Sequence, residues 1–179
     1  AIVFVNTFGN NMVPEGFDKK NLEIFEDITH GFNKKTCNTK SKITKIISLH
    51  GTKLISSFEG GLILTNSKKK YNYFKFNRYY SDKPLSSLRQ NNQMSEVEAI
   101  IAQNSLKNLK QNILNKKKIY QYYMKKFRDN LDTKNFTRIK KLNIDRDIFY
   151  RFIISNKKII FLRKKLRKIG IFVEKPITP

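Results

Sequence analysis

The stretch Ser48-Leu-His-Gly-Thr-Lys53-Leu-Ile-Ser-Ser-Phe-Glu59-Gly-Gly61 places a hydroxyl residue, a lysine and a glycine turn in close succession. The apolar run at residues 43–49 leads into it, and a second apolar run at residues 61–65 follows it. We expect both runs to form strands, with the two glycines turning the chain into the second. Ser48 and Lys53 would then lie at the end of a strand, where the side chains of a binding site commonly gather.

Two more apolar runs lie upstream of this stretch. Residues 1–5 are typical of a buried parallel strand, and residues 21–25 predict a second strand that ends at Glu26 and Asp27. The carboxyl ends of parallel strands face the same crevice. We therefore expect Asp27 to converge with Lys53, although many residues separate them in the chain.

The second half of the chain is more helical. We expect a helix at residues 67–77, then a boundary around the polar stretch 86–93, then a long helix that begins at the Ser95/Glu98 capping box and continues through residue 127. A stripe of apolar residues on the long helix is expected to pack in the core: Val97, Ile100, Ile101, Leu106, Leu109 and Ile113.

The last third predicts a strand at residues 148–155, a helix at 158–169 closed by Gly170, and a strand at 171–174. The layout favours an α/β protein. Residues 1–85 would form the later part of a large, mainly parallel-sheet domain, and residues 86–179 the long helix and a small, incomplete α+β domain. The chain starts inside an expected strand without Met and stops without a closing element, so we expect a fragment of a longer protein.

Three motifs together resemble those of the DegT/DnrJ-type sugar aminotransferases. They are Phe25-Glu26-Asp27-Ile-Thr-His30, the Ser48 to Gly61 stretch, and Asn91-Asn-Gln-Met94-Ser-Glu96. The resemblance implies fold type I of the pyridoxal-phosphate (PLP) dependent transferases, the fold of aspartate aminotransferase. It also implies PLP as the cofactor, and a transfer of an amino group from an amino acid, in most relatives glutamate, to a nucleotide-linked keto-deoxysugar in the cytoplasm.

The same resemblance assigns roles to five residues. Lys53 matches the lysine that holds the cofactor covalently and later moves a proton, and Asp27 matches the carboxylate that faces the pyridine nitrogen. Ser48 matches a phosphate-binding serine and His30 the residue beside the cofactor ring. Asn91 matches an asparagine that reaches the phosphate of a neighbouring subunit, which implies a homodimer with shared active sites.

The chain also departs from the family pattern. Gln93 stands where the family has an arginine at the phosphate, and the connection between Gly9 and Glu26 is short. These departures leave a catalytically degenerate protein of the same fold as an alternative. The part of the family that cradles the phosphate on a helix N-terminus is not matched, so we expect residues 1–179 alone to bind PLP poorly and to be inactive.

Charge gives a further alternative. The 179 residues carry a net charge of +23, which raises the possibility of an electrostatic nucleic-acid binder. Only eight of the 37 basic residues are arginine, the side chain that specific nucleic-acid recognition favours, so we expect no nucleic-acid partner. One cysteine and two histidines do not predict a metal site, and no apolar run has the roughly 18–20 residues that span a membrane.

Overall fold

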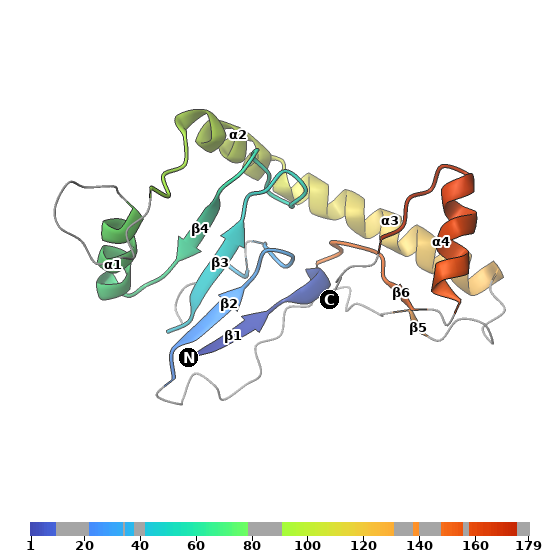
Figure 1. The fold of residues 1–179 in the computed structure, drawn as a ribbon, viewed down its shortest axis with the longest axis horizontal. Helices are drawn as coiled ribbons and strands as arrows, with labels where there is room; N and C mark the ends of the chain where they lie inside the picture. Colours follow the sequence, from blue (N-terminus) through green and yellow to red (C-terminus); the bar gives the residue numbers. More distant parts are fainter. Residues whose placement is uncertain are drawn as a thin grey trace. The chain divides into compact units, whose positions relative to one another are not determined.

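The computed structural model describes residues 1–9, 22–33, 35–37, 42–78, 91–130, 138–139, 148–155 and 158–174, and the chain divides into two compact units. The first unit combines Ala1–Tyr120 with Leu142–Arg151, and the second combines Gln121–Lys141 with Phe152–Pro179. Figure 1 labels the helices and strands of both units. The expected boundary near residue 86 falls outside the described residues.

A four-stranded sheet in the order β1-β2-β3-β4 belongs to the first unit (Figure 1). Its strands are β1 (Ile2–Val5), β2 (Ile24–Asp27), β3 (Thr44–Ser48) and β4 (Gly61–Leu64). Strands β1, β2 and β3 run parallel, whereas β4 runs antiparallel to β3. The four expected strands are confirmed, although β2 lies later than residues 21–25. The prediction that the first strand is buried is wrong, because β1 lies at the edge of the sheet and Val3 and Val5 are 60% and 59% exposed. The carboxyl ends of the three parallel strands therefore meet at one edge of the sheet.

A buried polar network explains why β2 continues through acidic residues. The Glu26 carboxylate accepts a hydrogen bond from Asn6 Nδ2 at 2.7 Å and lies 3.5 Å from Lys45 Nζ. Lys45 in turn donates to the carbonyl oxygen of Thr36 at 2.5 Å. Because both charged groups are buried and have partners, Glu26 can occupy the interior of a strand that its charge alone would oppose.

The hydrophobic core of the first unit is built from the turn after β2, from β3 and the loop that follows it, and from helices α2 (Glu96–Lys107) and α3 (Leu109–Asn130). The segment around residue 150 contributes as well. The core consists of Ile28, Phe32, Ile47, Leu49, Leu54, Ile55, Ala102, Leu109, Ile148 and Tyr150.

The prediction of one continuous helix from residue 95 to residue 127 is wrong. The capping box is confirmed, since Ser95 Oγ accepts from the Glu98 backbone N–H at 3.2 Å and Glu98 accepts from the Ser95 N–H at 3.0 Å. The helix ends at Asn108, however, and α3 starts at the next residue. The Asn108 side chain donates to the Asn104 carbonyl oxygen at 3.3 Å, a local bond of the kind by which asparagine disfavours helix interiors.

The expected apolar stripe is also only partly in the core. Leu109 is buried and Ile113 packs against the core, but Val97, Ile100 and Leu106 are 63%, 61% and 49% exposed. Val97, Ile100 and Leu106 belong to α2, whereas Leu109 and Ile113 belong to α3. The six residues thus do not form one face of a helix.

Helix α1 (Lys68–Arg78) follows β4 and confirms the helix expected at residues 67–77. Lys70 ties it to the sheet through an ion pair with Glu23 and a hydrogen bond to Thr44 Oγ1 at 3.2 Å. A hollow of about 520 Å³ is lined by residues of β3, β4 and α1.

The described residues of the second unit comprise the end of α3, two short strands and a further helix. Strands β5 (Arg138–Ile139) and β6 (Ile154–Ser155) pair antiparallel, and α4 (Ile159–Lys168) confirms the helix expected at 158–169. The prediction of a strand over all of residues 148–155 is wrong, because only its last two residues pair in a sheet. Ile148, which belongs to the first unit, instead donates its backbone N–H to the Gly9 carbonyl oxygen at 2.8 Å.

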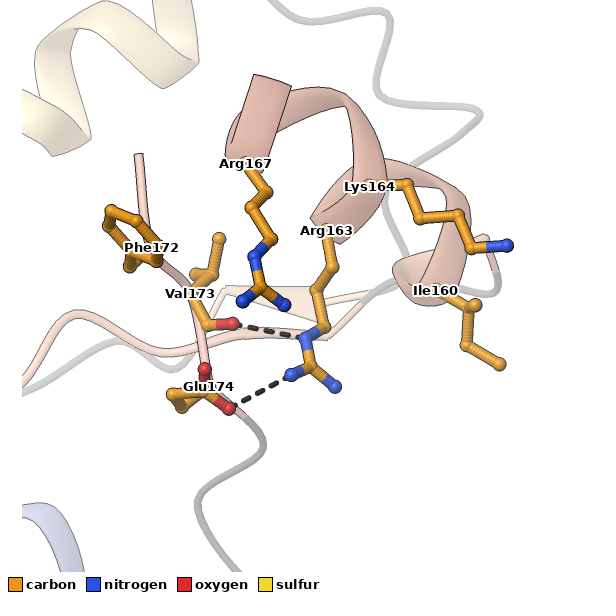
Figure 2. A pocket seen from close by; sticks show the side chains of 7 residues that line it. All are labelled: Ile160, Arg163, Lys164, Arg167, Phe172, Val173 and Glu174. Atoms are coloured by element: carbon orange, nitrogen blue, oxygen red, sulfur yellow. Dashed lines mark hydrogen bonds and ion pairs between the residues drawn. The ribbon is translucent and has the colours of Figure 1, made fainter. Parts of the chain in front are cut away.

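Residues 171–174 follow α4 without forming the expected strand. Gly170 closes the helix with a φ of 77°, as predicted, and the chain then lies against α4. Arg163 donates to the Val173 carbonyl oxygen at 3.0 Å and to Glu174 at 2.9 Å, around a pocket of about 210 Å³ (Figure 2). A side chain therefore takes the carbonyl that a strand would offer to a neighbour. None of the described helices is long and apolar enough to cross a membrane.

Candidate active site

Four of the five predicted site residues lie at the carboxyl edge of the parallel strands. Asp27 ends β2 and pairs in register with Ile46 of β3, whose last residue is Ser48. His30 follows Asp27 after a short turn, and Lys53 lies in the loop after β3. All four side chains are half-buried, so they are partly shielded from water and still accessible.

The closest contact of the site joins Lys53 to His30. Lys53 Nζ lies 3.2 Å from His30 Nε2, and His30 Nδ1 accepts the backbone N–H of Phe8 at 3.3 Å. Because Nδ1 accepts, a neutral His30 ring carries its own proton on Nε2, where it faces the Lys53 nitrogen. Nε2 can donate this proton to Lys53 Nζ only when the lysine amine is neutral, so the contact suits proton transfer once the amine has lost its own proton.

Aromatic rings fix the plane of the His30 imidazole. The Tyr150 ring stacks on it with centroids 4.2 Å apart and planes 14° apart, and the Phe8 ring lies 6.2 Å away at 15°. Burial lowers the pKa of His30 below 6.5, and the neighbouring Lys53 charge lowers it further, while Asp27 opposes the shift. The surroundings therefore favour the neutral imidazole.

Asp27 is held by the turn that it begins. Its Oδ1 accepts the backbone N–H of Thr29 at 2.9 Å, which fixes the carboxylate at the end of β2. In the described part of the chain this is the only hydrogen bond of the carboxylate, so its second oxygen remains available for a ligand. Its charge acts on His30, which places Asp27 electrostatically within the same cluster.

Ser48 is tied to the same turn through Thr29. The Ser48 backbone N–H donates to Thr29 Oγ1 at 3.0 Å, and Ser48 Oγ accepts the N–H of His50 at 3.3 Å. The hydroxyl proton of Ser48 is directed to no acceptor among the described residues, so the group can donate to an anion.

The loop that carries Lys53 is closed by backbone bonds. The Lys53 N–H donates to the His50 carbonyl oxygen at 2.9 Å, and the Leu49 N–H donates to the Gly60 carbonyl oxygen at 2.9 Å. Gly60 has a φ of 116°, and a Cβ there would lie 2.5 Å from the Met94 side chain. A glycine is therefore required where the loop returns to β4.

A family model describes the same chain as a whole. The model of the DegT/DnrJ/EryC1/StrS aminotransferase family matches residues 1–171. The chain belongs to this family.

Two curated relatives of known activity are similar to the chain, each at 27% identity. One is the dTDP-4-amino-4,6-dideoxy-D-glucose transaminase of Shigella dysenteriae, matched over 139 residues, which are 72% of this chain and 38% of that protein. The other is the UDP-4-amino-4,6-dideoxy-N-acetyl-beta-L-altrosamine transaminase of Campylobacter jejuni strain 81-176, matched over 145 residues, or 73% and 38%. The chain thus spans well under half the length of these relatives.

Solved structures of the DegT/DnrJ/EryC1/StrS family share the fold. A family member from Brucella abortus superimposes with a TM-score of 0.80 at 16% identity, over 99% of this chain and 50% of that one. A putative PLP-dependent aminotransferase from Bacillus cereus ATCC 10987 gives a TM-score of 0.77 at 21% identity, over 95% and 49%. The expected fold type I is confirmed, and the chain covers about half of it.

The fifth predicted residue of the DegT/DnrJ motifs lies apart from the other four. Asn91 is exposed, and no hydrogen bond joins it to them within the described part of the chain. Gln93 is also exposed, whereas Met94 packs against the core and reaches Gly60. Met94 therefore anchors this motif beside the Lys53 loop, while Asn91 and Gln93 face outward.

Sequence reasoning missed three residues of this site. Thr29 connects Asp27 to Ser48, and Phe8 donates to His30, yet neither residue type is rare enough to attract attention. Tyr150 comes from far along the chain, and its stacking on His30 has no signal in spacing. The single cysteine, Cys37, has its pKa raised by burial, and the described residues contain no cluster of three metal-ligating side chains.

Proposed function

We propose that this protein is a PLP-dependent aminotransferase that transfers an amino group to a nucleotide-linked keto-deoxysugar. The contact of Lys53 with His30 at the strand ends, beside the charge of Asp27, carries the proposal. Membership of the DegT/DnrJ/EryC1/StrS family and the transaminase activities of the curated relatives support it. We further propose glutamate as the amino donor and the cytoplasm as the location.

The chemistry of the side chains fits pyridoxal phosphate. The cofactor offers an aldehyde to an amine, a ring nitrogen to a carboxylate, and a phosphate to hydroxyl and N–H donors. Lys53 supplies the amine, and among the described residues one carboxylate oxygen of Asp27 and the hydroxyl proton of Ser48 have no partner. Each of the three groups thus has an atom left over for the matching part of the cofactor.

The residues of the chain would divide the work of the reaction. PLP, when bound, supplies a ring that takes up the electron pair released at the substrate carbon. The Lys53 amine would move a proton between that substrate carbon and the cofactor, and His30, 3.2 Å away, is placed to hold the proton in between. The Asp27 charge would keep the ring nitrogen protonated, and Ser48 would bind the phosphate.

Asn91 gains a role if two copies share their active sites. It is exposed and detached from the other four residues, as a group that serves a neighbouring subunit would be. We propose a homodimer in which Asn91 of one subunit binds the phosphate held by the other. Gln93 cannot supply the charge of an arginine at this position, which would weaken phosphate binding by roughly 1.5–3 kcal/mol unless another base replaces it.

Absorbance spectroscopy tests the proposal. The protein, produced with all sequence that its gene encodes and mixed with PLP, is expected to show the visible band of lysine-bound cofactor. Lys53→Ala should abolish the band, because no other amine of the described residues contacts His30. Lys107→Ala, an exposed change on α2, is the matched control and should retain it.

Two outcomes would contradict the proposal. A protein that binds PLP through Lys53 but does not aminate any nucleotide keto-sugar would be the catalytically degenerate alternative. A protein with no cofactor band, but with nucleic-acid binding that weakens steeply as salt rises, would be an electrostatic binder instead.

A further inference from the structure

We propose that Tyr150 is a positioning residue, which holds the His30 imidazole and the Lys53 loop in the geometry that their proton exchange needs. The role rests on the proposed function, because it concerns the same amine. Tyr150 itself is buried at 4% exposure and is placed to act through His30 and the loop.

The backbone that carries Tyr150 is firmly attached to the site. Ile148 donates its N–H to the Gly9 carbonyl oxygen at 2.8 Å, and Tyr150 donates its N–H to the Ile148 carbonyl oxygen at 2.9 Å. Gly9 has a φ of 87°, and a Cβ at this position would lie 1.9 Å from the Ile148 carbonyl oxygen. The two segments therefore approach as closely as a glycine permits, and the Tyr150 ring has a fixed origin.

The Tyr150 side chain makes two different contacts with the site. Its ring covers one face of the His30 imidazole, with centroids 4.2 Å apart and nearly parallel planes. Its hydroxyl donates to the carbonyl oxygen of Thr52 at 3.3 Å, one residue before Lys53. One side chain thus restrains both partners of the Lys53–His30 contact.

Together with Phe8, Tyr150 determines the orientation of the imidazole. The Phe8 N–H, bonded to Nδ1 at 3.3 Å, selects which nitrogen faces Lys53, and the Tyr150 ring sets the plane in which that nitrogen lies. A hydrogen bond between two nitrogens weakens steeply when its angle is lost. Without the stacked ring, His30 would keep its place in the chain but lose its alignment with Lys53.

The Tyr150 ring also faces three cations. Lys53 Nζ and Lys116 Nζ each lie 5.7 Å from its centroid, and the Arg151 guanidinium lies at 5.3 Å. The negative face of an aromatic ring attracts such groups at these distances. The ring therefore offsets the repulsion among these three positive side chains, which an aliphatic residue of similar size would not do.

Nuclear magnetic resonance tests this role directly, because the chain has only two histidines. The ring protons of His30 should be shifted upfield by the Tyr150 ring, and His50, which is exposed, serves as the internal reference. In Tyr150→Leu we expect the His30 signal to move towards that of His50 and its titration to change. In the protein produced with all sequence that its gene encodes, cofactor affinity should fall about three- to ten-fold, the effect of one stacked pair.

A matched variant separates positioning from simple packing. Tyr120 is similarly buried at 6% exposure, and its ring packs at a tilt of 44° on Phe149, the residue before Tyr150. Tyr120→Leu should lower stability as Tyr150→Leu does, but leave the His30 signal and titration unchanged. An unchanged His30 signal in Tyr150→Leu, or the same change in both variants, would overturn the proposal.

A second substitution covers the case in which Tyr150→Leu fails to fold. Tyr150→Phe keeps the stacked ring and removes the bond to Thr52, so His30 should be unchanged while amide exchange at Lys53 becomes faster. Unaltered exchange at Lys53 would contradict the hydroxyl's role. If the wild-type protein shows no cofactor band, but the upfield shift of the His30 signal still disappears in Tyr150→Leu, the proposed function fails and the positioning contact stands.

Discussion

Two ion pairs, one in each unit, differ in nearly everything except their charges. In the first unit, the side chains of Lys45 and Glu26 are 10% and 8% exposed, and Asn6 adds a further hydrogen bond. In the second unit, Arg163 and Glu174 form a shorter pair, but their side chains are 40% and 69% exposed (Figure 2). Judged by distance alone, the Arg163–Glu174 pair would be the stronger of the two. Burial reverses the ranking, because water screens the exposed pair.

The proposed catalytic groups and the α4 pocket also differ in how far they are shielded from water. His30 has an altered pKa because burial and the Lys53 charge act on it together. Around the α4 pocket, Phe172 and Ile160 are 72% and 71% exposed. The first unit therefore provides the conditions that chemistry needs, and the pocket of the second offers charge without shielding.

Of the substitutions predicted here, removal of the Glu26 carboxylate should lower the free energy of unfolding most. In Glu26→Ala the buried Lys45 ammonium loses its carboxylate, and the cost of an uncompensated buried charge is about 3–5 kcal/mol of the free energy of unfolding. Chemical denaturation of the full chain measures it. Glu59→Ala, which changes an acid 73% exposed at its side chain, is the control and should cost less than about 1 kcal/mol. Similar losses in the two variants would refute the ranking by burial.

The next prediction compares an alanine substitution at two glycines that have similar backbone angles but different surroundings. Gly9 and Gly170 have φ values of 87° and 77°, but a Cβ at Gly9 would meet the Ile148 backbone at 1.9 Å, whereas nothing lies within 4 Å at Gly170. Gly170→Ala should cost only backbone strain, about 1–2 kcal/mol. Gly9→Ala should add a steric cost and reach about 3 kcal/mol or more, measured by thermal unfolding. Equal losses would mean that the Gly9 contact relaxes freely.

The sequence predicted most of the sheet because its strands follow local patterns. Apolar runs bounded by turns define β1, β3 and β4, and strand order alone was enough to bring Asp27 near Lys53. The limits of β2 were misplaced, since a buried charge in a strand becomes acceptable only through partners that the pattern does not show. Here those partners are Asn6 and Lys45.

The remaining features depend on contacts between distant residues. The break at Asn108 is a competition between a helix and a local side-chain bond, which helical periodicity ignores. The segment at residues 171–174 has the apolar residues of a strand, but in the described part of the chain it pairs with no strand, and Arg163 takes the Val173 carbonyl oxygen instead. Tyr150 is the clearest case, because only the folded chain brings it to His30. The roles of the five site residues themselves stay predictions until the cofactor is tested.

The half-buried His30 imidazole should make the free energy of unfolding depend on pH. The pKa of His30 is lowered from 6.5 in the folded chain, so the unfolded chain takes up its proton first as the pH falls. The free energy of unfolding should therefore decrease as the pH drops below about 6.5, and level off below the folded pKa. His30→Gln should remove this part of the pH dependence, and His50→Gln should retain it. Denaturation curves at several pH values provide the measurement, and an identical profile in His30→Gln would contradict the assigned environment.

The smallest effect is expected at the exposed pair of the second unit. Glu174→Gln removes the charge opposite Arg163 but leaves the guanidinium bonded to the Val173 carbonyl oxygen. The free energy of unfolding should change by less than about 1 kcal/mol, and 1 M salt should erase even that difference, because it reduces the screening length to about 3 Å. The effect of Glu26→Ala should survive the same salt, since the buried pair is little screened. A salt-sensitive loss at Glu26, or a salt-insensitive one at Glu174, would show that exposure does not set the strength of these two pairs.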